Sequence, residues 1–462
     1  MTWWLATSHA GGREKVLAKD KNDKNTKDER QKAVPTSRAG RLARVARMAG
    51  GVAGGMLAEG TRQLRAGKRP RARDMLLTPA NARRVAEQLA TMRGAAMKVG
   101  QILSMDTGDF LPRELADILA RLRADAHYMP TQQLRKVMSD AYGADWEQLF
   151  YGFEMKPLAA ASIGQVHRTV APDGREIVLK VQYPGVSSSI DSDVDNIATL
   201  LRMSGLLPPE LNIQPLLEDA KRQLKDEADY YKEAKFLESF HELLQDDDRF
   251  LVPQLLPELT RSTVLAMTYV SGKPIESIVT LPQEERDRVM TALVELMFME
   301  LFELRMVQTD PNFANYLYRG SSGQIVLLDF GATRHFKAGF VNGYRKLLAA
   351  ALSDDEDKLV QAAERIGYAM GDEDSQYRAL VLELFLLALE PLRHEGVYDF
   401  ARSDMARRMS LLAEDVADYR DFWQAPPTDA MYFHRKLGGM FLLASRVKAR
   451  VDVNSLVRRV ID

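Results

Sequence analysis

The hydrophobic pattern changes along the first half of the chain. Residues 78–126 carry apolar side chains at helical spacing, for example at Val85, Leu89 and Met92, and this spacing predicts an α-helical extension. Residues 152–170 and 177–181 are typical of β-strands, and the sequence Ala-Pro-Asp-Gly at 171–174 predicts a tight turn between them. The pattern therefore predicts a helical segment followed by a small β-containing unit.

The second half of the chain is predominantly helical in its pattern. Residues 188–244 predict helices, residues 252–270 predict strand again, and amphipathic helices dominate from residue 284 onward. The apolar residues 325–330 predict a buried strand within this helical part, whereas residues 296–302 are most simply core. The expected fold class is α+β, with a small β-containing lobe followed by a larger helical lobe.

Composition narrows the class of protein. The chain has 462 residues, 46% of them hydrophobic and 27% charged, which is ordinary for a globular protein of two to four structural units. It contains no cysteine, so disulfide frameworks, thiol catalysis, zinc fingers and iron–sulfur clusters are excluded.

Charge is distributed unevenly along the chain. Residues 1–73 hold 18 Lys and Arg against 6 Asp and Glu, although the net charge of the whole chain is −1. This asymmetry predicts a basic arm on an acidic body, and the arm would contact anionic lipid or nucleic acid, or remain solvated. Apart from Trp3 and Trp4 the arm has no interleaved aromatic residues, so we expect no nucleic-acid partner.

Within this arm, residues 11–37 are polar and predict a flexible tail. Residues 38–60 combine regularly spaced arginines with a run of glycine and apolar residues, a pattern of a helix that lies at a membrane interface. The alternative is a glycine-rich docking helix or linker. No apolar run approaches the roughly 18 residues that span a bilayer, so we expect a cytoplasmic protein that touches a membrane at its surface.

Two short motifs carry the most specific chemistry. Asp310 is followed five positions later by Asn315, and Asp329 opens an Asp-Phe-Gly sequence after an apolar strand. Kinases use this pattern to position a nucleophile and to hold magnesium. Either motif alone is weak, because each also occurs at ordinary turns. Together they predict that Asp310 orients the attacking hydroxyl or water, while Asn315 and Asp329 hold Mg²⁺.

Lys180 strengthens this interpretation because it lies in an otherwise apolar strand upstream of both motifs. Such a lysine needs an anionic partner, or it extends its ammonium to water at a sheet edge. Its place in chain order favours a lysine that grips nucleotide phosphates and pairs with a glutamate. Glu233 is the candidate glutamate, although a solvated charged face is the simpler explanation for its acidic helix.

Three further motifs carry a family resemblance. They are Lys98, Gly100 and Gln101 within 91–104, the alanine-rich stretch 157–167, and Glu227 with Asp229. With these motifs the chain resembles the UbiB-type atypical kinase-like family over about residues 34–450, most closely its coenzyme Q members from mitochondria and their bacterial relatives. The resemblance implies a two-lobed protein-kinase-like fold that binds ATP or ADP with Mg²⁺.

The resemblance also implies roles for particular residues. The nucleotide would be contacted by the alanine-rich loop and by the predicted strands at 177–181 and 252–270. The contacting residues would be Ala159, Ala160, Ala161, Ser162, Lys180, Met267 and Tyr269. Lys98 and Gln101 would fold over the cleft with Glu227 and Asp229 as polar partners. Without the resemblance, an exposed helix lysine is the simpler explanation for Lys98. A cleft closed by its own chain would exclude protein substrates.

The expected organisation has five parts. These are a flexible basic tail (1–37), a basic glycine-rich membrane-associating segment (38–72), a helical extension (73–145), a kinase-like N-lobe (146–270) and a kinase-like C-lobe (271–462). One departure from the family lies in the catalytic loop, which has Asn312, Phe313 and Ala314 where relatives usually have His-Pro-Gly.

The resemblance implies Mg²⁺-dependent ATPase activity, or phosphorylation of a small or lipid-like substrate, in support of ubiquinone biosynthesis. It also implies a peripheral location at the inner membrane. Expected partners besides ATP are ubiquinone precursors or anionic lipid, and other ubiquinone biosynthesis proteins. The alternative is a nucleotide-gated scaffold without catalysis, which handles lipid or assembles the biosynthetic complex. The presence of Asp310, Asn315, Asp329 and Lys180 together favours the enzyme.

Overall fold

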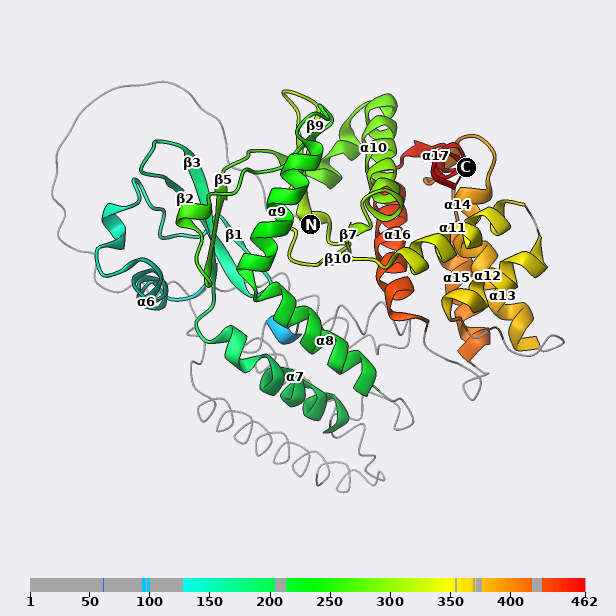
Figure 1. The fold of residues 1–462 in the computed structure, drawn as a ribbon, viewed down its shortest axis with the longest axis horizontal. Helices are drawn as coiled ribbons and strands as arrows, with labels where there is room; N and C mark the ends of the chain where they lie inside the picture. The colour runs from blue at the N-terminus through cyan, green and yellow to red at the C-terminus, as the bar shows by residue number, and fades with distance from the viewer. Residues whose placement is uncertain are drawn as a thin grey trace.

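The computed structural model describes residues 61, 94–96, 98–99, 128–203, 213–353, 355–368, 370, 376–417 and 426–461. These residues form a β-containing lobe and a larger helical lobe (Figure 1). The predicted tail, the basic glycine-rich segment apart from Thr61, and most of the helical extension lie outside the described residues. No helix in the described ranges is both long and apolar enough to span a membrane.

The smaller lobe is built on a four-stranded antiparallel sheet in the order β1-β2-β3-β5. Its strands are β1 (Ala159–Ala160), β2 (Gly164–Val170), β3 (Glu176–Gln182) and β5 (Val264–Thr268). The predicted turn between β2 and β3 is confirmed, since the Gly174 N–H donates to the Ala171 carbonyl at 2.9 Å.

Strand β3 is buried on both faces. Its alternate residues Ile177, Leu179 and Val181 pack into an apolar cluster that also contains residues of α6 (Thr131–Tyr142). Val178 packs on the opposite face, into the main core of the molecule. Because side chains alternate along a strand, Lys180 shares this second face with Val178 and is directed toward the interior between the lobes.

Three helices connect this sheet to the rest of the molecule: α7 (Val186–Met203), α8 (Gln214–Glu227) and α9 (Tyr230–Leu244). Asp229 is the N-cap of helix α9, and its carboxylate accepts the Lys232 N–H at 3.0 Å. The buried face of α9 repeats at helical spacing through Tyr230, Glu233, Ala234 and Leu237. A single carboxylate, that of Glu233, is thus carried into an apolar interior.

The larger lobe is mainly helical. Its helices are α10 (Gln283–Phe302), α11 (Ala338–Leu352), α12 (Glu356–Ile366), α13 (Gln376–Ala388), α14 (Glu390–Arg393), α15 (Met405–Ala417), α16 (Thr428–Arg446) and α17 (Val453–Ile461). The 3₁₀ turns of the described chain are Trp146–Gln148, Pro257–Leu259, Ile275–Thr280 and Phe313–Asn315. Helix α10 packs against α16 and α17, and the expected core residues Leu296 and Met297 are buried in this interface region.

Short strands frame the junction of the lobes. A second sheet has the order β4-β9-β8-β6, and two-stranded sheets join β7 to β10 and β11 to β12. The bounds are β4 (Phe250–Leu251), β6 (Lys273–Pro274), β7 (Met306–Gln308), β8 (Tyr316–Arg319), β9 (Gln324–Leu327), β10 (Thr333–His335), β11 (Tyr398–Asp399) and β12 (Arg450–Val451). The predicted buried strand at 325–330 is confirmed in its first three residues by β9.

Two strand predictions were too long. Residues 152–158 form no strand, and residues 252–270 contain only β5 together with the 3₁₀ turn Pro257–Leu259. Proline at 253 and 257 interrupts the hydrogen bonding that a continuous strand would need. Strands β7, β8 and β10 were missed because three or four residues are too few to display an alternating pattern.

A buried histidine in β2 makes the stability of the smaller lobe depend on pH. The Met129 N–H donates to Gln165 Oε1 at 3.0 Å, so the Gln165 amide nitrogen faces His167 Nε2, 2.7 Å away. His167 Nε2 must then accept, and His167 Nδ1 donates to the Glu154 carbonyl at 2.7 Å. Only the neutral imidazole satisfies both partners, and burial lowers the pKa of His167 to about 4.

We therefore expect the contribution of His167 to the free energy of unfolding to fall as the pH drops from 6.5 toward 4. In this window the unfolded chain takes up the proton and the folded chain does not. The full loss is about 3 kcal/mol. Urea unfolding at pH 7.5, 6 and 5 measures it. The contribution of His167 is the difference in slope between the unsubstituted protein and His167→Asn, because burial also lowers the pKa of His434 to about 4 and raises the pKa values of Glu233 and Glu300 to about 7. Replacing the exposed His335 with glutamine should preserve the original slope, and an unchanged slope in His167→Asn contradicts the assignment.

Candidate functional site

Lys180 lies at the centre of the candidate site. Its ammonium donates to Glu233 Oε1 at 2.6 Å and to Asp329 Oδ2 at 3.1 Å. The side chains of Lys180 and Glu233 are 10% and 2% exposed, so the lysine is enclosed by carboxylates and does not extend to bulk water. The sequence-based pairing of Lys180 with Glu233 is present, and the edge-strand alternative for Lys180 is wrong.

The electrostatics of this cluster keep the lysine charged. Burial alone would lower the pKa of Lys180, but the charges of Asp329 and Glu233 outweigh it and raise that pKa well above its usual value. Burial pushes the pKa of Asp329 upward, yet the Lys180 charge and the Gly331 N–H hold it below its usual value. Lys180 is therefore a fixed positive charge beside an ionised Asp329.

The loop between β7 and β8 carries Asp310 and Asn315. Strand β7 pairs with β10, which follows the Asp-Phe-Gly sequence, so this pairing holds the loop beside Asp329. Asn315 Nδ2 donates to Asp310 Oδ2 at 3.1 Å. Asn312, one of the residues that departs from the family pattern, accepts the Ala314 N–H at 3.2 Å. This contact shapes a 3₁₀ turn at Phe313–Asn315 and orients Asn315.

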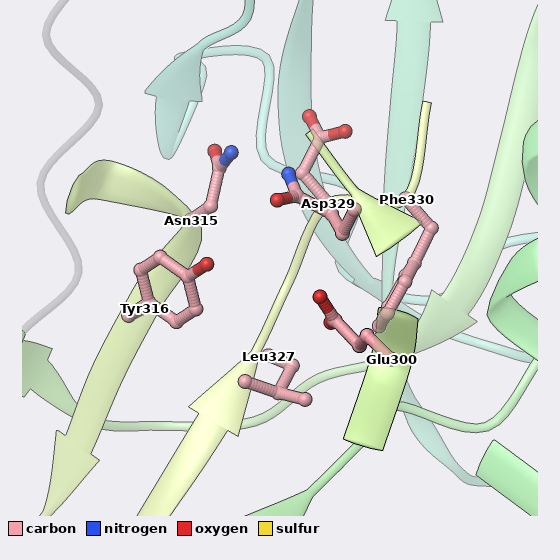
Figure 2. A pocket seen from close by; sticks show the side chains of 7 residues that line it. Glu300, Asn315, Tyr316, Leu327, Asp329 and Phe330 are labelled. Carbon is pink, nitrogen blue, oxygen red and sulfur yellow. The ribbon is translucent and has the colours of Figure 1, made fainter. Parts of the chain in front are cut away.

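Asp329 and Asn315 offer oxygen ligands to a divalent cation. Asp329 Oδ1 accepts the Gly331 N–H at 2.9 Å, which fixes the carboxylate directly after β9. In Figure 2 the Asp329 carboxylate and the Asn315 amide point the same way, above the lining residues of a small cavity. Because Asn315 donates through its nitrogen, its amide oxygen stays available as a ligand. One carboxylate and one amide oxygen fit Mg²⁺, which completes its shell with phosphate and water.

Lys98 is brought to the same region from the far N-terminal side. It is 3% exposed and pairs with Glu227, and Ser162 Oγ donates to the other Glu227 oxygen at 2.6 Å. A Cβ at Gly94 would lie 2.9 Å from the Ser162 carbonyl oxygen, so this segment rests directly on the end of the alanine-rich loop. The alternative that Lys98 is an exposed helix lysine is therefore wrong. Gln101, which was predicted to fold over the cleft together with Lys98, lies outside the described residues.

Charges link Lys98 to the catalytic loop. Burial lowers the pKa of Lys98, but the charges of Glu227 and Asp310 outweigh burial and raise it. Burial raises the pKa of Asp310, and the Lys98 charge opposes that rise. Asp229, in contrast, is exposed and caps α9. Of the two acidic residues in the Glu-x-Asp motif, Glu227 is the one that contacts Lys98.

The remaining predicted nucleotide contacts lie along the sheet. Ala159 and Ala160 are exposed and form β1, while the Ala161 N–H donates to the Gly164 carbonyl at 3.0 Å. Met267 is paired in register with Val178, so it shares the face of Lys180. Tyr269 follows β5, with the Arg168 guanidinium 4.3 Å from its ring centroid.

Sequence reasoning missed a buried polar cluster beneath the site. Glu300, Gln308 and Tyr316 line the small cavity beside Asn315 and Asp329; Lys436 of α16 reaches Glu300, Gln308 and Tyr316. The sequence could have indicated Glu300, because it is the one charged residue within the apolar run 296–302. An unpaired charge in such a run is costly, so a buried partner is expected.

Comparisons with known proteins show the family and the fold to which this chain is similar. The sequence matches the ABC1 atypical kinase-like domain over residues 121–363. It is 37% identical over 422 residues to the Caenorhabditis elegans protein named atypical kinase coq-8, mitochondrial, an alignment covering 89% of this chain but only 56% of that protein. It is 36% identical over 413 residues to the Saccharomyces cerevisiae protein named atypical kinase COQ8, mitochondrial, covering 89% of this chain and 82% of that protein.

A solved structure shares the fold. The structure of Rv3197 with erythromycin from Mycobacterium tuberculosis superposes with a TM-score of 0.57 at 24% identity, covering 82% of this chain and 96% of that one. This likeness concerns the fold alone, and it agrees with the expected two-lobed α+β architecture.

Proposed function

This chain belongs to the ABC1 atypical kinase-like family, and from that premise we propose that it binds ATP with Mg²⁺ between its lobes and catalyses phosphoryl transfer. Either water or a small or lipid-like hydroxyl compound accepts the γ-phosphoryl group. The observation that carries the proposal is the convergence of Lys180, Asp329, Asn315 and Asp310 at one junction of β3, β9 and the β7–β8 loop.

Each residue has a role that follows from its charge and position. Lys180, oriented by Glu233, binds phosphate oxygens. Asp310 orients the attacking hydroxyl or water and takes up its proton as the new P–O bond forms and the bond to the leaving ADP oxygen breaks. Asn315 and Asp329 would hold Mg²⁺, which would neutralise charge on the phosphates when bound. The chain thus contributes positioning and electrostatic stabilisation.

The Lys98–Glu227–Ser162 contacts favour a small acceptor. They tie the segment around Lys98 to the alanine-rich loop on one side and to α8 on the other. A polypeptide loop would have to displace this buried ion pair to reach Asp310. We therefore propose a small or lipid-like acceptor, with a role in ubiquinone biosynthesis and peripheral association with the inner membrane, in keeping with relatives named COQ8 and mitochondrial.

Phosphate release from the purified full chain tests the proposal. We expect Mg²⁺-dependent release from ATP, increased by anionic liposomes together with a ubiquinone-precursor analogue. Liposomes of neutral lipid and an analogue without a hydroxyl group are the controls. A single-turnover assay in which the protein binds ATP but releases no phosphate would support the alternative, a nucleotide-gated scaffold.

The alanine-rich loop provides a prediction on nucleotide preference. Ala159 pairs with Val166 in the edge strand β1, and glycine there removes a methyl group and frees the backbone. We expect Ala159→Gly to raise affinity for ATP relative to ADP by about threefold or more, a factor that thermal-shift titration with Mg²⁺ detects. Exposed Ala401 replaced with glycine is the control. An unchanged affinity ratio in Ala159→Gly contradicts the role given to the alanines.

A further inference from the structure

Helix α16 lies against the catalytic loop, although the two are far apart in sequence. The Lys436 ammonium donates to the Tyr316 hydroxyl at 2.9 Å and to Gln308 Oε1 at 3.4 Å, across 128 residues of sequence in the second case. Gln308 is the last residue of β7 and Tyr316 the first of β8. One ammonium therefore connects both ends of the loop that carries Asp310 and Asn315.

Lys436 is also paired with a buried carboxylate. Its ammonium lies 3.4 Å from Glu300 Oε2 on α10, and the side chains of Lys436 and Glu300 are 3% and 2% exposed. In Figure 2 the Glu300 carboxylate lies below Asp329, in the small cavity that Tyr316 also lines. Replacing such a buried pair by apolar residues is often neutral or stabilising. Stability alone therefore does not account for a charged pair at this position.

A second contact of α16 reaches the middle of the loop. A Cβ at Gly439 would lie 2.3 Å from Pro311 Cβ and 3.2 Å from Pro311 Cα. Pro311 directly follows Asp310, and its ring cannot move away without its backbone. Gly439 lies three residues after Lys436, on the same side of the helix. The neighbouring Gly438 is exposed, and a Cβ there would meet nothing within 4 Å.

We infer that α16 positions the catalytic loop. Lys436 fixes the two ends of the loop, and Gly439 allows Pro311 to approach α16 closely, which determines the position of Asp310. Both are positioning residues, and both lie beyond residues 121–363, the part of the chain that matches the family domain. The inference rests on the proposed function for the step it would affect. Small displacements of an orienting group are sufficient to slow a reaction about a hundredfold.

The adjacent glycines give a matched test. Gly439→Ala and Gly438→Ala make the same change at neighbouring positions of one helix, and both favour helix formation. We expect Gly439→Ala to lower kcat for Mg²⁺-dependent ATP hydrolysis about tenfold or more, with metal-free ADP affinity within about threefold of the unsubstituted protein. Gly438→Ala should retain the original kcat. Equal kcat values in the two variants would overturn the inference.

Lys436 is tested in a background that keeps the buried charge balanced. Lys436→Met alone leaves Glu300 unpaired, so the double variant Lys436→Met/Glu300→Gln is used to preserve folding, which thermal unfolding measures. We expect the thermal unfolding midpoint of the double variant to lie within a few degrees of that of the unsubstituted protein, and its kcat to fall about tenfold. Lys436→Arg keeps the positive charge, so its kcat should lie between those of the double variant and the unsubstituted protein. A folded double variant with full kcat overturns the positioning role of Lys436.

A separate readout distinguishes this inference from the proposed function. If the unsubstituted protein releases no phosphate, the proposed function fails on its own. The inference is then decided by Mn²⁺ affinity of the ADP complex, measured by electron paramagnetic resonance, because Asn315 belongs to the same loop. We expect Gly439→Ala to weaken Mn²⁺ binding severalfold and Gly438→Ala to leave it unchanged; equal affinities overturn the inference.

Discussion

Replacing Asp329 with asparagine is expected to abolish Mg²⁺-dependent turnover while the protein stays folded. Asparagine can still accept the Gly331 N–H through its side-chain oxygen, as Asp329 does at 2.9 Å, so the turn after β9 is retained. The negative charge that would hold Mg²⁺ is lost, however. We expect kcat to fall about a hundredfold or more, in line with the several kcal/mol that a bound metal contributes to such a reaction.

A control with the same local geometry exists elsewhere in the chain. Asp399 accepts the Ala401 N–H at 3.0 Å, again two residues ahead, but it lies in β11 of the larger lobe. Asp399→Asn should therefore reproduce any general effect of the substitution on the turn and leave phosphate release unchanged. Turnover at the original rate in Asp329→Asn would falsify the metal-binding role of Asp329.

The placement of the candidate site residues was predictable because it follows from chain order and local pattern. Lys180 stands out as a charge within an apolar strand, and since β3 is buried on both faces, either face would place Lys180 in the interior. Asp310, Asn315 and Asp329 lie close in sequence, so the pairing of β7 with β10 brings them together with little additional information. The family resemblance predicted from the motifs is confirmed by the matches to ABC1 and COQ8 proteins.

The partner of Lys180 required a longer inference. Glu233 lies 53 residues after Lys180, and other carboxylates surround it in sequence. Helical spacing selects it, because Glu233 falls on the same stripe as the buried Tyr230 and Leu237. Asp229 falls instead at the helix start, where an acidic residue is expected to cap the helix.

The cluster below the site was not predictable in the same way. Lys436 and Glu300 belong to helices α16 and α10, which are far apart in sequence. The local sequence of either helix does not indicate that the two residues form a pair. A lysine and a glutamate in helices are ordinarily solvent-exposed. Only tertiary packing, which places α16 against the β7–β8 loop, turns these two side chains into a buried ion pair.

Lys180→Met is expected to weaken nucleotide binding and to lower turnover together. Each hydrogen bond to a charged group contributes about 1.5–3 kcal/mol, so we expect Mg-ADP affinity to fall roughly 10- to 150-fold. Turnover should fall further, because charge on the phosphates increases as the bond to ADP breaks. Thermal-shift titration and phosphate release measure the two effects separately.

The same variant leaves Glu233 buried without its cation, so binding must be separated from folding. Lys180→Met/Glu233→Gln removes both charges, and we expect it to regain thermal stability without regaining ADP binding. Lys221 is the matched control: its side chain is 13% exposed and pairs with Asp195 at 2.7 Å, away from the site. Lys221→Met should change ADP affinity by less than about twofold. If the folded double variant bound ADP as tightly as the original protein, Lys180 would not be the phosphate ligand, and the convergence of side chains around it would need another explanation.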